Sequence, residues 1–166
     1  MSCATACNAT PLPADVEITN VKSGLMCLYQ PNAEGDQKID PKVCFDTAEI
    51  KITGQGQCVF DGKQRPCTWY GFEFTYNNKT NNQITMTCHF TSNKPKVLGN
   101  PEGVLADDDT NYEIKLEPGK GHFSNPQYTL FRYTNSVETS LNINRCEIDG
   151  REAFEARFNI TLPAKP

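Results

Sequence analysis

The sequence predicts an all-β fold, an antiparallel β-sandwich of about nine or ten strands held together by disulfides. Three observations support this prediction. Apolar and polar residues alternate along most of the chain from Val16 onward, turn-forming residues separate the alternating runs, and eight cysteines are spread over 166 residues. An open barrel with a packed core is the alternative. Because the length suits one domain, we expect residues 15–166 to form it and residues 1–14 to be an N-terminal arm.

Five runs alternate clearly, and each is expected to be a strand with one face in the core and the other in water. These runs cover residues 16–19, 48–53, 69–76, 83–90 and 112–116. An Asn-rich tract at residues 77–82 follows the third run. The tract favours a hairpin loop that pairs the third run with the fourth.

The C-terminal part of the chain is expected to be a strand as well. Residues 151–158 consist of good helix formers, but the alternation continues to Leu162 and so favours a strand. Asp149-Gly150, just before this segment, predicts a hairpin turn. Two polar stretches, residues 31–42 and 94–110, are expected to be loops.

The cysteines indicate an oxidising compartment. None of them has zinc-site spacing, either with another cysteine or with the two histidines. Val, Ile, Leu and Phe make up only 34 of the 166 residues, so cross-links should support a thin core. We therefore expect four disulfides and a secreted, periplasmic or extracellular location, with a metal site or free thiols as alternatives. The cysteines are Cys3, Cys7, Cys27, Cys44, Cys58, Cys67, Cys88 and Cys146.

One pairing is predicted from the spacing. A two-residue turn at Gly62-Lys63 would place Cys58 opposite Cys67, within the distance that a disulfide spans. Cys3 and Cys7 are expected to tie the N-terminal arm to the body of the domain. The pairing of the remaining cysteines stays open; they are Cys27, Cys44, Cys88 and Cys146.

The first residues contain no secretory leader, because no apolar segment follows Met1. We expect that a signal peptide has been removed, and lipid anchoring through Cys3 is the alternative. No apolar run has the length that a transmembrane segment needs.

The pattern is compatible with an immunoglobulin-like architecture but does not support membership of that family. Trp69 lies on the polar face of its run, and neither Cys88 nor Cys146 is preceded by a tyrosine two residues earlier. Immunoglobulin domains place their tryptophan in the core and their tyrosine at that position.

Trp69 is the strongest candidate for a binding residue. If the even-numbered positions of its run face the core, the indole lies on the outer face beside Glu73. Across the expected hairpin, its neighbours include Thr87 and His89. An exposed indole can stack on a sugar ring or anchor a protein contact. The alternative is structural, with Trp69 covering the Cys58–Cys67 bridge or buried between two sheets.

A calcium site and three glycosylation sites are weaker candidates. Asp107, Asp108 and Asp109 supply the oxygen ligands that calcium prefers, although an ordinary acidic turn is the favoured explanation. We expect no other cofactor. Asn-x-Thr sequons occur at Asn8, Asn78 and Asn159, and the last two are expected to be accessible.

Catalysis has little support in the sequence. His122 lies near Ser124, but no strand-to-helix turn of the nucleophile-elbow kind accompanies them. His89 is expected on the water face of its strand. Paired carboxylates could serve glycoside hydrolysis, but a solvated sheet face is the favoured explanation for them. They are Glu73, Glu113, Glu138 and Glu155.

Together these features predict a secreted or periplasmic binding module without catalytic activity. It would recognise a protein or a glycan at a cell surface, as an effector, adhesin or inhibitor does. The formal net charge of −4 argues against a nucleic-acid partner. The alternatives are a carbohydrate-binding module that uses Trp69, with or without calcium, and a small secreted hydrolase. The oligomeric state is not predicted.

Overall fold

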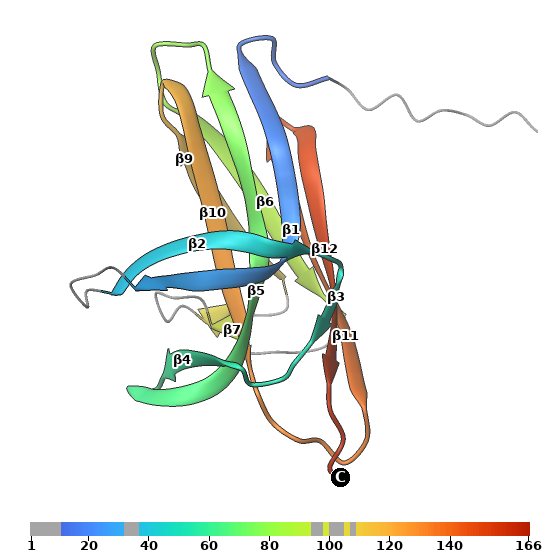
Figure 1. Cartoon of the computed structure of the whole chain (residues 1–166). Helices are drawn as coiled ribbons and strands as arrows, with labels where there is room; N and C mark the ends of the chain where they lie inside the picture. The colour runs from blue at the N-terminus through green and yellow to red at the C-terminus, as the bar shows by residue number, and fades with distance from the viewer. Residues whose placement is uncertain (1–10, 32–36, 94–97, 100–104, 107–108) are drawn as a thin grey trace, which may run out of the picture.

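The fold is a sandwich of two β-sheets, seen in a computed structural model that describes residues 11–31, 37–93, 98–99, 105–106 and 109–166 (Figure 1). The described residues contain twelve strands and no helix, and ten of these strands have three or more residues. The predicted all-β class is therefore confirmed. Within the described ranges, no helical segment has the length and hydropathy of a membrane span.

The strands divide into two sheets. The first sheet has the order β2-β1-β5-β10-β7-β8, with β4 also paired to β5. The second sheet has the order β3-β12-β11-β6-β9, in which only the β3–β12 pair is parallel. The first sheet contains β1 (Val16–Pro31), β2 (Gln37–Asp46), β4 (Gly56–Phe60), β5 (Lys63–Asn78), β7 (Leu98–Gly99), β8 (Leu105–Ala106) and β10 (Gly119–Leu130). The second contains β3 (Glu49–Lys51), β6 (Ile84–Ser92), β9 (Asp109–Leu116), β11 (Glu138–Ile148) and β12 (Arg151–Leu162).

The core lies between the two sheets and is dominated by aromatic rings. Alternation along β5 buries Tyr70, Phe72 and Phe74 completely, as their even-numbered positions predict. Phe154 and Phe158 of β12 meet these rings from the second sheet, with ring centroids 5.1–5.3 Å apart. The predicted strand through residues 151–162 and its hairpin turn are both confirmed, since Ile148 pairs with Arg151 across Asp149-Gly150.

Three sequence predictions about loops are wrong in whole or in part. Within the stretch 94–110, residues 98–99, 105–106 and 109–110 belong to strands β7, β8 and β9. Residues 37–42 belong to strand β2 rather than to a loop. The tract at 77–82 does not close a hairpin, because β5 and β6 lie in different sheets and do not pair. The side chain of Asn78 holds this corner together: its Nδ2 donates to the carbonyls of Asn82 (2.8 Å) and Leu116 (3.0 Å).

All six cysteines among the described residues form disulfides, which fits an oxidising compartment such as the periplasm or the extracellular space. The pairs are Cys27–Cys44, Cys58–Cys67 and Cys88–Cys146. Cys3 and Cys7 lie outside the described residues, and no described cysteine is left to receive the predicted tie from the arm.

The Cys58–Cys67 pairing is confirmed, but the turn that was expected to produce it is displaced. The turn residues are Asp61 and Gly62, both with positive φ, so that Phe60 pairs with Lys63. Cys58 therefore lies opposite Arg65, and the bridge runs diagonally to Cys67 with a Cα–Cα distance of 5.9 Å. A type I′ turn, with positive φ at both positions, accounts for the shift in register.

The β1–β2 ribbon leaves the sandwich and folds over its first sheet. The β1–β2 pairing contains bulges after Leu25, with the extra residues in β2, and β2 crosses the outer face of β5 and β10 (Figure 1). The Val43 amide donates to Glu73 Oε2 over 3.1 Å, and the Ser124 hydroxyl donates to the Pro41 carbonyl over 2.8 Å. A side chain on Gly24 would clash with the Phe45 carbonyl oxygen, so the fold requires glycine at this crossing.

Candidate functional site

An apolar groove of about 430 Å³ lies where one edge of the first sheet meets one edge of the second. The β1–β2 ribbon forms one side, β3 forms another, and the start of β4 with Trp69 of β5 completes it. This volume is within the range of about 300–1,000 Å³ typical of ligand pockets. We call it the junction groove; it is lined by Leu25, Met26, Cys27, Cys44, Phe45, Glu49, Lys51, Thr53, Gln55, Gly56, Thr68 and Trp69.

Phe45 is the most unusual residue of the junction groove, because 68% of its surface is exposed. It follows Cys44, whose disulfide to Cys27 cross-links the ribbon next to it. An aromatic side chain on a cross-linked ribbon loses little conformational freedom when it binds, and aromatic residues are common at binding hot spots.

Trp69 forms the opposite wall and is held in place by three contacts. Its Nε1 donates to the carbonyl of Gln57 over 3.1 Å, and its ring meets the edge of Tyr128 with centroids 4.9 Å apart. It also packs against the Cys58–Cys67 bridge. The structural alternative for Trp69 is thus correct, and the indole in addition lines the junction groove.

The predicted binding set is divided between the two outer faces of the sandwich. Trp69 and Glu73 lie on β5 in the first sheet, whereas Thr87 and His89 lie on β6 in the second. The expected adjacency across a hairpin is therefore wrong, because the Asn-rich corner joins two sheets. Glu73 is also only 8% exposed beneath β2. A binding role for Thr87 and His89 remains a prediction that is separate from Trp69.

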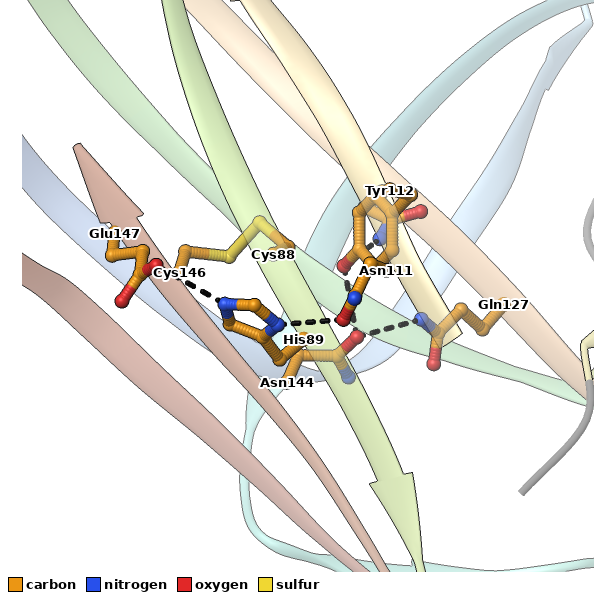
Figure 2. Close-up of a disulfide and its surroundings, with 9 residues drawn as sticks. Cys88, His89, Asn111, Tyr112, Gln127, Asn144, Cys146 and Glu147 are labelled. Carbon is orange, nitrogen blue, oxygen red and sulfur yellow. Dashed lines mark hydrogen bonds and ion pairs between the residues drawn. A yellow bond between two sulfur atoms is a disulfide. The ribbon is translucent and has the colours of Figure 1, made fainter. Parts of the chain in front are cut away.

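His89 bridges its two neighbouring strands on the outer face of the second sheet (Figure 2). Its Nδ1 lies 2.6 Å from Asn111 Oδ1 on β9, and its Nε2 lies 3.2 Å from Glu147 Oε1 on β11. The hydrogen bond with Glu147 raises the pKa of His89 most, and the bond with Asn111 adds to it. Both partners favour the protonated ring.

We expect the pKa of His89, measured by NMR titration of its ring protons, to lie above the ordinary value of 6.5. Since folding raises this pKa, the stabilisation by His89 is complete below the unfolded pKa and is lost as the pH rises through the folded pKa. Glu147→Gln should lower the pKa of His89. Glu113→Gln, which removes a partner of Lys115, should leave it unchanged. An unchanged pKa in Glu147→Gln would contradict this assignment.

A second polar group lies on the inner side of the same sheet, near the Cys88–Cys146 bridge (Figure 2). The Tyr112 hydroxyl donates to Asn144 Oδ1 over 2.8 Å and accepts a hydrogen bond from Asn125 Nδ2 over 2.9 Å. Gln127 Nε2 reaches Asn144 Oδ1 over 3.4 Å. The cluster links the two sheets at one side of the core, and burial raises the pKa of Tyr112.

The calcium and glycosylation candidates fall partly outside the described residues, as Asp107, Asp108 and Asn8 do; Asp109 begins β9. Within the part of the chain that the structure describes, no group of three His, Cys, Asp or Glu side chains could hold a metal ion. Asn78 is 1% exposed and bonded through Nδ2, so the expectation that it is accessible is wrong. Asn159 is exposed, and its Nδ2 donates to Glu49 Oε1 over 2.6 Å.

The candidate catalytic residues are engaged in contacts of other kinds. Ser124 donates its hydroxyl to a backbone carbonyl, while His122 Nε2 lies 3.7 Å from Glu73 Oε2. His122 lines a second, more polar hollow of about 640 Å³ on the first sheet. The other carboxylates each pair with a basic side chain: Glu113 with Lys115, Glu138 with Arg132, and Glu155 with Arg145 and Arg157.

The sequence prediction missed Phe45 and Met26 as parts of a site. Both lie in the β1–β2 ribbon, where bulges interrupt the alternation that identified the other strands. The available signal was an aromatic residue directly after Cys44 in a stretch with few apolar residues.

The known proteins found by comparison are only distantly similar to this chain. No family model and no curated protein matches the chain. An immunoglobulin-like protein from Pseudomonas aeruginosa (PA1606) is 15% identical, with a TM-score of 0.46 over 89% of this chain and 99% of that one. The N-terminal domain of PorA is 14% identical, with a TM-score of 0.38 over 72% and 90%. Neither likeness carries an argument about function, and the fold rests on the strand pairing described above.

Proposed function

We propose that this protein is a secreted or periplasmic binding module without catalytic activity, and that it recognises a protein partner through the junction groove. The observation that carries the proposal is Phe45, which is 68% exposed at the mouth of an apolar groove. Burying such a side chain contributes about 1.5–3 kcal/mol, so a partner that covers it gains binding energy.

The composition of the junction groove supports a protein partner. Its floor contains Leu25 and Met26, and its rim carries the exposed side chains of Glu49, Lys51 and Gln55. An apolar centre within a polar rim is the usual arrangement of a protein–protein contact. The three disulfides support the oxidising location that the proposal assigns to the protein.

Phe45→Ser should abolish retention of the partner without unfolding the protein. The immobilised, oxidised protein would be exposed to a cell-envelope extract, and the bound proteins would be identified by mass spectrometry. Val137→Ser is the matched control, because Val137 is 62% exposed and lies outside the groove. We expect one species to be retained by the wild type and by Val137→Ser, and lost with Phe45→Ser. Equal retention by all three proteins would contradict the proposal.

The two alternatives make different predictions in parallel assays. A carbohydrate-binding module would retain glycans on an array, and calcium removal with EDTA would abolish this binding if the acidic segment holds the ion. A hydrolase would turn over model esters or glycosides and would lose that activity in His122→Asn or Ser124→Ala. We expect neither result.

A further inference from the structure

The outer edge of β3 opens onto the junction groove without a partner strand among the described residues. β3 is the terminal strand of the second sheet and pairs with β12 on one side (Figure 1). The even-numbered residues that flank β3 form hydrogen bonds with β12: Asn159 N donates to Ala48 O, and Ile52 N donates to Thr161 O. In a parallel ladder, the odd-numbered residues of β3 must point their backbone groups the other way.

The open part of this edge is centred on Lys51. The Glu49 amide donates to Thr47 Oγ1 over 3.1 Å, and the Thr53 amide donates to Thr68 Oγ1 over 3.0 Å. Between them, no described residue hydrogen-bonds to the N–H or C=O of Lys51. A backbone N–H and C=O left unpaired at the edge of a sheet can form hydrogen bonds with an additional strand.

The side chains of β3 leave this edge accessible. Ile50 is buried in the core, whereas Glu49 bonds to Asn159 on the outer face. Lys51 is two residues from Glu49 and therefore projects to the same outer face. From this face the two charged side chains border the groove at its rim.

We propose that the junction groove takes an extended polypeptide segment, which adds a strand beside β3 and bonds through its backbone to the N–H and C=O of Lys51. This proposal rests on the proposed function and deepens it, because it specifies that the partner binds as an extended polypeptide segment. Only an extended chain offers a donor and an acceptor at this spacing together with side chains for an apolar floor.

The geometry also specifies the partner's sequence pattern. Side chains of an added strand alternate between two faces, so those on one face enter the groove toward Phe45 and Met26. Those on the other face lie beside Glu49 and Lys51, where opposite charges are favoured. The bound segment should therefore have apolar residues two positions apart, with a basic and an acidic residue at the alternating positions.

Lys51→Pro tests the proposal, because proline removes the outward N–H and leaves the ladder with β12 intact. Lys51→Thr is the matched control: it removes the charge and keeps the N–H. The probes are peptides selected by the wild-type protein from a phage-displayed random library. Lys51→Pro should weaken their binding about ten-fold or more, and Lys51→Thr much less. Equal binding by Lys51→Pro and wild type, or equal loss in both variants, would overturn strand addition.

A second measurement does not depend on the folding of a variant. Methylating the backbone amides of a selected peptide one at a time should weaken binding to the wild type with a period of two residues, the signature of a paired strand. A uniform effect, a failure to select any peptide, or a glycan or a second copy of this chain as the only ligand would overturn the proposal. If Phe45→Ser abolishes retention of the partner but Lys51→Pro does not, the proposed function stands and strand addition fails.

Discussion

The double variant Cys88→Ala/Cys146→Ala should lose about 4 kcal/mol of stability relative to the oxidised wild type. The two residues lie directly opposite each other in β6 and β11, are 0% exposed, and close a loop with a sequence separation of 58. Removing the bridge frees this long loop in the unfolded chain. Urea unfolding followed by circular dichroism measures the loss as a lower transition midpoint.

A comparison with Cys27→Ala/Cys44→Ala tests the physical reason. That bridge has a sequence separation of 17, so its removal should cost less, about 3 kcal/mol. A smaller loss for the Cys88–Cys146 pair than for the Cys27–Cys44 pair would contradict the loop-closure explanation. Unchanged midpoints in both variants would show that the disulfides do not support the fold.

Phe74→Ala should cost about 3–5 kcal/mol, the usual loss when a large aromatic side chain is removed from a core. Phe74 is 0% exposed and lies 5.3 Å from the ring of Phe154 and 5.5 Å from that of Phe123, measured between centroids. It therefore joins the two sheets through Phe154. The remaining cavity cannot be filled without moving both sheets.

Phe45→Ala is the matched control, because it makes the same substitution at a site that is 68% exposed. Its effect on stability should stay within about 0.5 kcal/mol, as is usual for surface positions. Thermal unfolding of the two variants would separate them clearly. A loss of similar size at Phe45 would place its ring in the folded core and would remove the basis of the junction groove.

Sequence alternation predicted the faces of single strands but not their partners. The pleat of a strand requires side chains to alternate, so the burial of Tyr70, Phe72 and Phe74 followed directly from their positions. The same alternation occurs whether two strands pair in one sheet or face each other across the core. At the corner between β5 and β6, the chain is held by hydrogen bonds of the Asn78 side chain, and a periodic sequence pattern does not reveal such bonds.

The junction groove could not be predicted because it depends on departures from regular structure. Bulges direct the β1–β2 ribbon across the first sheet, and they interrupt the pattern that would have placed Met26 and Phe45. The inner face of β11 could not be recognised from the sequence either, because its buried positions Asn142 and Asn144 are polar. Each finds hydrogen-bond partners inside the sandwich, which alternation of apolar residues does not register.

The most direct test of the junction groove as the binding site uses Trp69, the only tryptophan of the chain. Protein labelled with 5-fluorotryptophan should give one ¹⁹F resonance from a side chain that lines the groove. We predict that the bound partner shifts this resonance in the wild type and in Val137→Ser, and leaves it in place in Phe45→Ser. A partner that binds the wild type without moving the resonance would contradict the account.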